Sequence, residues 1–168
     1  MAVIGIYQNI WDKYRNVIGI WIRQVINGET ITVYGDGLQK RAFSDMKYCC
    51  EPFEKLAKGF NAEVFNIGSD DSISLIDAAK LVQKCGENFG YKSDIKNLEP
   101  RCETKFAYAD HTKAKNLLQF KDNTNLEYSI NEMFEWALSQ PQRDVKSMKY
   151  EITKIYMGIG NKCLLKNI

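Results

Sequence analysis

Arg41 is the residue whose surroundings most favour the binding of an anion. It lies in "VYGDGLQKRAF", residues 33 to 43, where Gly35 and Gly37 flank Asp36 and apolar residues follow the arginine. The planar guanidinium can donate to two oxygens of a carboxylate or a phosphate at once. From the residues alone, Arg41 is either such an anion-binding group or a surface side chain whose stem covers apolar neighbours.

The other residue types that carry chemistry are scattered rather than clustered. His111 is the single histidine, and it stands at an expected helix start without a nearby nucleophile, so we expect an exposed residue with no catalytic role. The neighbouring Cys49 and Cys50 are expected to pack as small hydrophobic residues. There is no CxxC pair to indicate a zinc site and no GxGxxG or GxxGxxG turn to indicate dinucleotide binding.

The composition is that of a globular protein. The 168 residues are 45% hydrophobic and 26% charged, which allows a sizeable core, and the formal net charge of +2 does not indicate a nucleic-acid binder. No stretch reaches the roughly 18 apolar residues of a membrane span. The N-terminus lacks the pattern of a signal peptide. We therefore expect a soluble, cytoplasmic chain that contacts neither membranes nor nucleic acids.

Helical and strand-like segments alternate along the chain, which favours an α/β fold. Helical spacing of apolar residues covers 17–26, 51–60, 75–89, 111–118 and 124–140. Strand-like runs cover 30–34, 41–44, 63–68 and 93–99. Ser74 with Asp77, and Thr124 with Glu127, have the spacing of helix capping boxes. The glycine turn is expected to fold the strand before it back toward the strand after it.

Four ordered blocks of sequence carry a family resemblance. They are "YRNVIGIWIRQVINGETITVYGDGLQKRAFS", "EVFNIGSDDSISLIDAAKLV", "EPRCETKFAYADHTKAKNLL" and "TNLEYSINEMFEWAL". In order and spacing, residues 7 to 150 resemble the C-terminal, substrate-binding half of extended short-chain dehydrogenases, most closely the NAD-dependent epimerases and dehydratases of the UDP-glucose 4-epimerase type. The resemblance implies an incomplete Rossmann-like fold over residues 1–145, followed by a basic tail at 146–168.

The resemblance also implies roles for individual residues. The arginine after the glycine turn lies against the nucleotide diphosphate in this family, which assigns that role to Arg41. Arg101 corresponds to a second arginine near the nucleotide, and Glu103 to an acceptor for ribose hydroxyls. Asn16 and Val17 belong to the segment that lines the substrate pocket. The implied ligand is a nucleotide diphosphate sugar, of which a UDP-sugar is the expected kind.

The family's catalytic residues have no counterparts in this chain. Relatives use NAD together with a tyrosine and a lysine four residues later, whereas Ile18 stands four residues after Tyr14. We therefore expect no catalytic residue here and no NAD bound by this chain alone, with an N-terminal catalytic half supplied elsewhere. Two alternatives stay open, a non-catalytic remnant acting as an interaction or regulatory module and an autonomous enzyme with an unrecognised site.

An incomplete body would leave apolar surface uncovered. We expect the helix at 17–26 and the strand at 41–44 to lack part of their cover, because the large sheet of the family draws most of its strands from the missing half. Exposed apolar faces favour self-association. The basic tail carries apolar residues at helical spacing and is expected to dock on the body or to be a loose terminus rather than to bind a membrane.

Overall fold

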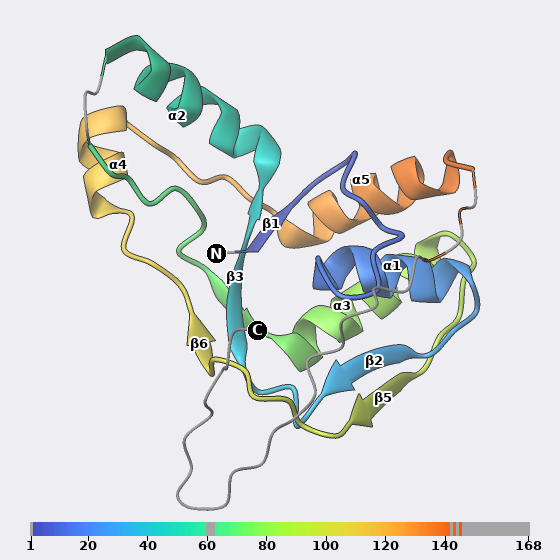
Figure 1. Cartoon of the computed structure of the whole chain (residues 1–168). Coiled ribbons are helices and arrows are strands. Elements are labelled where there is room, and N and C mark those ends of the chain that lie inside the picture. Colours follow the sequence, from blue (N-terminus) through green and yellow to red (C-terminus); the bar gives the residue numbers. More distant parts are fainter. Residues whose placement is uncertain (1, 60–62, 142, 144, 146–168) are drawn as a thin grey trace, which may run out of the picture.

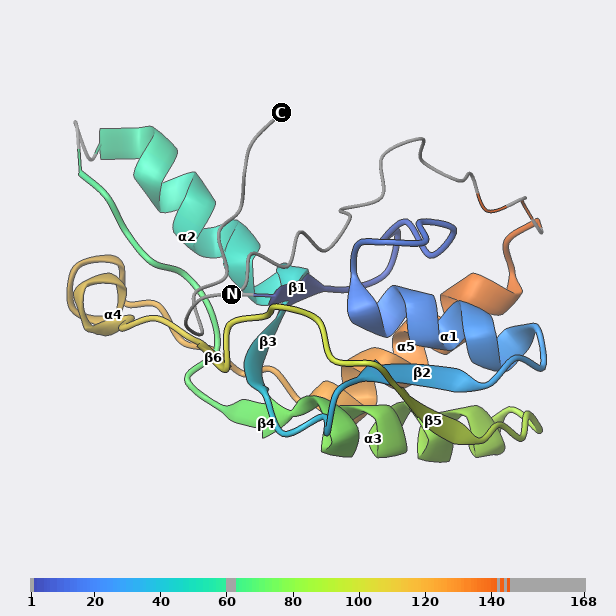
Figure 2. The same cartoon turned by 60° about the horizontal axis from the view of Figure 1, so that its bottom comes forward.

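The computed structural model describes residues 2–59, 63–141, 143 and 145 as an α/β protein, so the basic tail at 146–168 lies outside the described residues. The helices are α1 (Val17–Ile26), α2 (Met46–Gly59), α3 (Leu75–Asn88), α4 (Thr112–Leu118) and α5 (Leu126–Leu138). Helices α1, α3 and α5 form one group, while α2 and α4 lie together on the other side of strand β3 (Lys40–Asp45) (Figures 1 and 2).

Strand β3 lies between these two groups of helices, and it pairs with other strands along its whole length. Its residues 43–45 pair in parallel with β1 (Ala2–Ile4). Its residues 40–42 pair antiparallel with β4 (Ser72–Ser74), and 40–41 pair in parallel with β6 (Phe106–Ala107). A separate parallel pair is formed by β2 (Ile31–Tyr34) and β5 (Ile95–Leu98), in register from Ile31 opposite Ile95 to Tyr34 opposite Leu98.

The main core lies between α1, α3, α5 and the β2–β5 pair. Trp21 and Ile22 of α1, Val82 of α3 and Phe134 of α5 are each at most 1% exposed. The indole Nε1 of Trp21 donates to the carbonyl oxygen of Thr32 at 2.8 Å, which ties α1 to β2. Burial of such side chains contributes roughly 1.5–3 kcal/mol each, so this core is the main source of stability for the strands that border the site.

A second, smaller core holds α2 against α4. Its buried members are Cys49, Ile67, Ala114, Leu118 and Phe120. The thiols of Cys49 and Cys50 are both free, and Cys49 is buried whereas Cys50 is exposed. The expectation that these cysteines pack as hydrophobic residues is therefore confirmed for Cys49 and wrong for Cys50.

Several local predictions are confirmed. The α/β class is confirmed, α1 has the bounds expected from its apolar spacing, and β5 lies within the strand expected at 93–99. Ser74 caps α3, because its Oγ accepts from the backbone N of Asp77 at 3.1 Å. These features depend on residues that are close together in the sequence, where spacing and capping chemistry act directly.

The prediction that the glycine turn closes a hairpin is wrong, because β2 and β3 do not pair. Gly35 and Gly37 do have the positive φ expected of the turn, 70° and 73°. A Cβ atom at Gly37 would lie only 2.8 Å from the Cβ of Ile76, so the turn packs tightly on the start of α3. It carries the chain from one sheet to the other.

The segment 63–68 is not a strand. Ile67 enters the second core instead, with Phe65 packed against that core. The backbone N of Ser69 then donates to Oγ of Ser44 at 2.7 Å, so a side chain of β3 holds the following backbone. The strand that does pair with β3 in this part of the chain is β4, a few residues later.

Two helix starts also differ from expectation. Helix α2 begins at Met46 rather than near Pro52, because Oδ1 of Asp45 accepts from the backbone N of Lys47 at 3.0 Å and caps the earlier turn. Helix α5 is capped by Asn125 and not by Thr124. The Thr124 hydroxyl accepts instead from the backbone N of Asp45 at 3.0 Å, so a tertiary contact uses the expected cap.

The surfaces expected to be bare are covered. On α1, the side chains of Ile18, Trp21, Ile22 and Val25 are at most 1% exposed, and Phe43 of β3 is 3% exposed. Self-association through these two faces is therefore not supported. In the part of the chain that the structure describes, no helix combines the length and the apolar character needed to cross a membrane.

Candidate functional site

Arg41 is held in place by backbone carbonyl groups. Its Nη1 donates to the carbonyl oxygens of Lys40 at 2.9 Å and Thr104 at 2.8 Å, and its Nη2 lies 3.3 Å from Oε2 of Glu103. The side chain is 17% exposed. Among the described residues, Nε–H and one N–H of Nη2 have no partner, so a fixed pair of donors is available to a ligand.

Arg101 lies over the ring of Tyr34. Its Cζ is 3.5 Å from the ring centroid, and its Nη2 contacts the Tyr34 hydroxyl. The pairing register brings the two residues together, because Tyr34 is the last residue of β2 and lies opposite Leu98, three residues before Arg101. A guanidinium on an aromatic ring forms a flat, positively charged surface.

An open pocket of about 730 Å³ lies beside these residues, at the carboxyl ends of β2 and β5. Its polar lining includes Tyr34, Gln39, Asn97, Arg101, Glu103 and Lys105. Two side chains brace the glycine turn at its wall: Asn97 donates to the carbonyl oxygen of Gly35 at 2.6 Å, and Gln39 to that of Tyr34 at 3.0 Å. Arg41 borders the pocket through its contact with Glu103.

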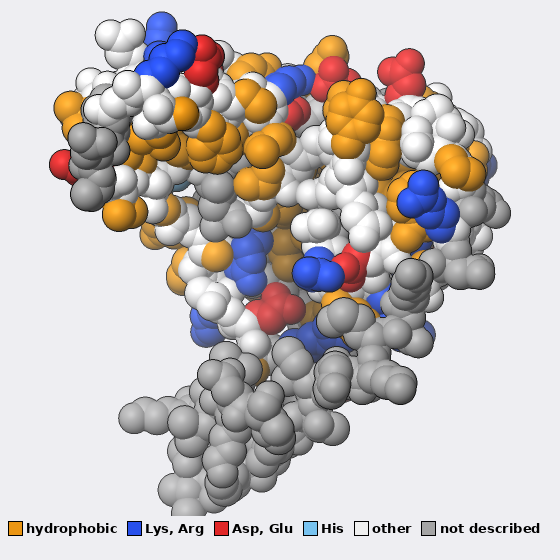
Figure 3. Space-filling model, turned by 45° about the horizontal axis from the view of Figure 1, so that its top comes forward, with side chains coloured by type: hydrophobic (Ala, Val, Ile, Leu, Met, Phe, Trp, Pro, Cys, Tyr) orange, Lys and Arg blue, Asp and Glu red, His pale blue; other side chains and the backbone are white. Residues whose placement is uncertain are grey.

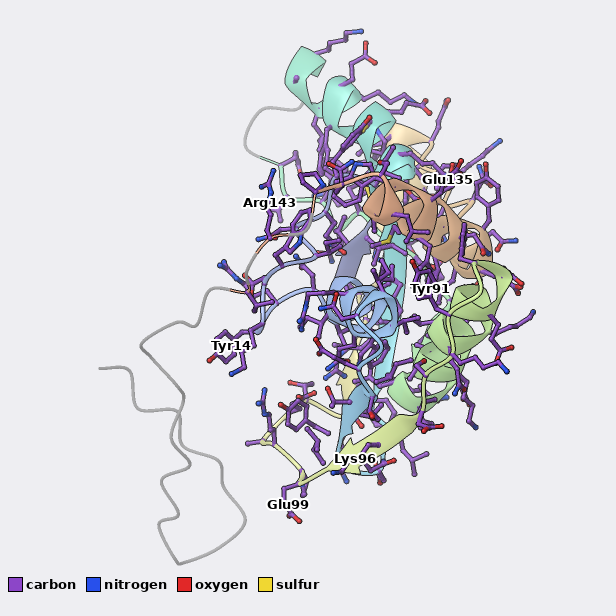
Figure 4. The ribbon with its side chains drawn as sticks, turned by 90° about the vertical axis from the view of Figure 1, so that its right-hand side faces the viewer. Tyr14, Tyr91, Lys96, Glu99, Glu135 and Arg143 are labelled. Atoms are coloured by element: carbon purple, nitrogen blue, oxygen red, sulfur yellow. The ribbon has the colours of Figure 1, made fainter. Side chains whose placement is uncertain are left out.

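The structure therefore brings Arg41, Arg101 and Glu103 to one place, whereas Asn16 and Val17 are elsewhere. Asn16 precedes α1 with a positive φ of 65° and an exposed side chain that makes no capping bond, and Val17 packs against the main core. Neither lines the pocket. Tyr14, which lies just before them, is well separated from the pocket residue Glu99 in Figure 4.

Four further polar residues line this pocket without having been predicted from the sequence, namely Tyr34, Gln39, Asn97 and Lys105. For Tyr34 a signal existed, because an aromatic residue directly before a glycine turn at a strand end is placed to form a pocket wall. Asn97 and Lys105 lie in an unremarkable polar stretch. Their position depends on the pairing of β5 with β2 and of β6 with β3, which local pattern does not predict.

His111 is not the exposed residue that its place at a helix start suggested. Its side chain is 1% exposed, and its Nδ1 lies 2.9 Å from Oδ1 of Asp70. Lys115 contacts the other oxygen of the same carboxylate, and the bonds from Lys115 and His111 lower the pKa of Asp70. Among the described residues, no group of three or more metal-ligating side chains could hold a metal ion.

No protein-family model matches the chain. Among characterised proteins, UDP-N-acetyl-alpha-D-glucosaminuronate decarboxylase of Bacillus cytotoxicus is 28% identical over 138 residues, which cover 73% of this chain and 40% of that protein. UDP-glucuronic acid decarboxylase 2 of Arabidopsis thaliana is 27% identical over 117 residues, covering 68% of this chain and 25% of that protein. The chain thus spans less than half the length of these relatives.

Solved structures show the same fold. UDP-N-acetylglucosamine 4-epimerase of Methanobrevibacter ruminantium, in complex with UDP-N-acetylmuramic acid, is 26% identical with a TM-score of 0.74, over 83% of this chain and 44% of that one. UDP-glucuronic acid 4-epimerase of Bacillus cereus, in complex with UDP-glucuronic acid and NAD, is 24% identical with a TM-score of 0.69, over 80% and 42%. The Rossmann-like α/β architecture is therefore shared over part of those chains.

Proposed function

Because the chain is a partial homologue of NAD-dependent nucleotide-sugar epimerases and decarboxylases, we propose that it is the substrate-binding portion of such an enzyme and that it holds a UDP-sugar. The observation that carries this proposal is that Arg101 and Glu103 line one open pocket and that Arg41 contacts Glu103 at its border. Arg41 is distant in sequence from Arg101 and Glu103, and together the three residues offer donors for phosphate, an acceptor for hydroxyl groups and a flat surface for a base.

Arg41 receives the diphosphate in this proposal. Its free Nε–H and Nη2 donors point away from the two carbonyl groups that fix the guanidinium, so a phosphate can be bound without reorganising the side chain. Bonds between a guanidinium and phosphate oxygens are charge-assisted and about twice as strong as neutral ones. The single contact to Glu103, at 3.3 Å, leaves this positive charge only partly balanced.

Tyr34 and Arg101 receive the base, and Glu103 accepts from the ribose hydroxyls. The exposed face of the stacked guanidinium is a platform for a flat aromatic ring. Glu103 lines the pocket and contacts Arg41, so the sugar that joins base and diphosphate would pass beside its carboxylate. We assign Asn16 and Val17 to the sugar end of the substrate, in keeping with the exposed side chain of Asn16, which makes no capping bond to α1.

The chain's own residues do not fit NAD. A dinucleotide site needs a glycine-rich turn between a strand and a helix, so that backbone N–H groups can approach the pyrophosphate. The connection from β1 to α1 contains one glycine, Gly5, and the residue before α1 is Asn16 in a left-handed conformation. We therefore assign cofactor binding and proton transfer to polypeptide outside residues 1–168. Within this chain, residues 1–145 are the proposed substrate-binding portion and residues 146–168 are the basic tail.

Isothermal titration calorimetry of the chain with UDP and UDP-glucuronic acid tests the proposal. Replacing Arg41 by Ala should weaken binding of both by roughly 1.5–3 kcal/mol, the range for hydrogen bonds to a charged group. Lys58→Ala is the control, because Lys58 is 71% exposed, pairs with Glu54 on α2 and does not line the pocket. Equal affinities for the wild type and Arg41→Ala would remove the diphosphate role from Arg41.

A further inference from the structure

The surface that Tyr34 and Arg101 form cannot by itself select one base. Stacking on aromatic rings and guanidinium groups tolerates any nucleobase, because every base has a π-face. Hydrophobic side chains gather mainly over other parts of the molecule in Figure 3, and the pocket beside this surface has a largely polar lining. Selection of uracil, which the proposed function requires, therefore needs a polar group that meets the edge of the base.

Asn97 of β5 lies beside this surface. Its side chain is exposed and lines the pocket. Its Nδ2 donates to the carbonyl oxygen of Gly35 at 2.6 Å, and Gly35 directly follows Tyr34 in the chain. The parallel pairing of β5 with β2 is what brings the amide to the glycine turn. The amide group of Asn97 is thus placed at the border of the surface that would receive the base.

The bond to Gly35 decides which end of the amide remains available. A backbone carbonyl group only accepts hydrogen bonds, so the amide nitrogen of Asn97 must face it. Oδ1 is then an acceptor, and among the described residues it has no hydrogen-bond partner. Because the side chain is already held by the turn, a ligand can use this acceptor at little cost in ordering.

The other polar groups of the pocket leave this role to Asn97. Arg101 and Lys105 can only donate, and Glu103 is assigned to the ribose hydroxyls. Gln39 is the other amide in the lining, and its Nε2 donates to the carbonyl oxygen of Tyr34 at 3.0 Å. Gln39 is half-buried whereas Asn97 is exposed, so the acceptor of Asn97 is the more accessible of the two.

We infer that Oδ1 of Asn97 accepts the N3–H of uracil and thereby selects uridine nucleotides. Uracil carries a donor at N3, whereas cytosine carries a lone pair there, which would leave Oδ1 facing another acceptor. The amino group of cytosine is one ring atom away, and a shift of the base to reach it is opposed by the diphosphate bound at Arg41. The inference rests on the proposed function, because it takes the ligand to be a UDP-sugar.

Isothermal titration calorimetry of the chain with UDP, N3-methyl-UDP and CDP tests the inference. N3-methyl-UDP keeps the ring, the ribose and the diphosphate of UDP but lacks the donor at N3. The wild type should bind N3-methyl-UDP and CDP at least about tenfold more weakly than UDP, since a site built to bond a donor rejects the analogue without it. Pyrophosphate, which has no base, measures the contribution of the diphosphate alone.

Three variants separate base selection from support of the turn. Asn97→Ala should bring the affinities for UDP and N3-methyl-UDP to within about twofold of each other. Asn97→Asp keeps an oxygen acceptor and should retain the preference for UDP, although its charge weakens binding of both ligands. Gln39→Ala removes the other brace of the same turn, so it should weaken binding of both ligands by a similar factor and leave the preference unchanged.

Three results would overturn the inference. They are equal affinities of the wild type for UDP and N3-methyl-UDP, a preference for UDP that survives Asn97→Ala or is lost in Asn97→Asp, and an equal loss of preference in Gln39→Ala, which would show that the shape of the turn selects the base. The proposed function survives each of them if Arg41→Ala still weakens binding of UDP and of pyrophosphate. Absence of any UDP binding by the wild type would overturn both.

Discussion

The buried carboxylate of Asp45 joins three elements next to the proposed site. Ser129 of α5 donates to Oδ2 at 2.6 Å, and the backbone N of Lys47 at the start of α2 donates to Oδ1 at 3.0 Å. The backbone N of Asp45 donates in turn to the Thr124 hydroxyl. Since Asp45 ends the strand that carries Arg41, these bonds fix the direction in which β3 presents the arginine.

Replacing Ser129 by Ala should therefore destabilise the protein. Ser129 is 1% exposed, and its loss leaves a buried carboxylate short of one donor, a change that costs roughly 1–3 kcal/mol. Urea unfolding measures the effect. Ser139→Ala is the control, because Ser139 is exposed after the end of the same helix and should change the free energy of unfolding by less than about 0.5 kcal/mol. Equal losses in the two variants would contradict this account of Asp45.

At the scale of elements, α4 is attached to the preceding loop through Asp70. The imidazole of His111 and the ammonium of Lys115, both at α4, contact the two oxygens of this carboxylate. Both interactions favour the ionised form, which is why the pKa of Asp70 lies below its ordinary value of 3.8. The half-exposed carboxylate thus connects a polar contact at the surface with the second core beneath it.

Asp70→Asn should make the protein less stable at neutral pH but not in acid. An ionised carboxylate that is favoured in the folded state stabilises fully above its ordinary pKa of 3.8, and this contribution is lost as the pH falls through the lowered pKa of the folded state. The difference in free energy of unfolding between wild type and variant should therefore shrink below pH 3.8. Asp71→Asn, next in sequence and without an ion pair among the described residues, should show no such dependence.

The whole molecule presents an open pocket of about 730 Å³ at the carboxyl ends of β2 and β5 and, among the described residues, a strand β1 that is paired on one side only. Epimerisation or decarboxylation through NAD needs a nicotinamide placed against the sugar ring and a proton acceptor within reach. The relatives for which these activities are named are more than twice as long as the matched region. Binding and turnover should therefore be separable in this chain.

The isolated chain should bind UDP-glucuronic acid without converting it, even when NAD is supplied. Absorbance of reduced nicotinamide should stay constant, and chromatography should recover the UDP-sugar unchanged. The positive control is a chimaera in which this chain replaces the matching 138 residues of the Bacillus cytotoxicus decarboxylase. Turnover by the isolated chain that disappears in Arg41→Ala would show that a catalytic group has been overlooked near this pocket.

Local chemistry was enough to predict those features in which neighbouring residues act on each other. The apolar spacing from Val17 to Ile26 predicts α1 with its observed bounds, and Ser74 with Asp77 predicts the cap of α3. The four ordered blocks of sequence likewise predicted the fold class, since order and spacing along a chain are preserved in its relatives. Such signals need no knowledge of which distant segments meet.

Features that depend on contacts between distant segments could not be predicted from local sequence. Thr124 and Asn125 are both good helix caps, and the choice between them follows from the contact of Thr124 with Asp45, 79 residues away. The glycine turn is compatible with a hairpin, yet β2 pairs with β5, because packing of Gly37 on α3 directs the chain into the other sheet.

Arg41 shows the same division at the proposed site. Its residue type and its place after the turn indicated an anion-binding group, but its partners could not be inferred from its neighbours. Glu103 and Thr104 follow 62 and 63 residues later, and they reach the guanidinium because β6 pairs with β3. The orientation of Arg41 therefore depends on how the strands pair. The free energy that favours this pairing comes from contacts across the whole molecule and not from the eleven residues around the turn.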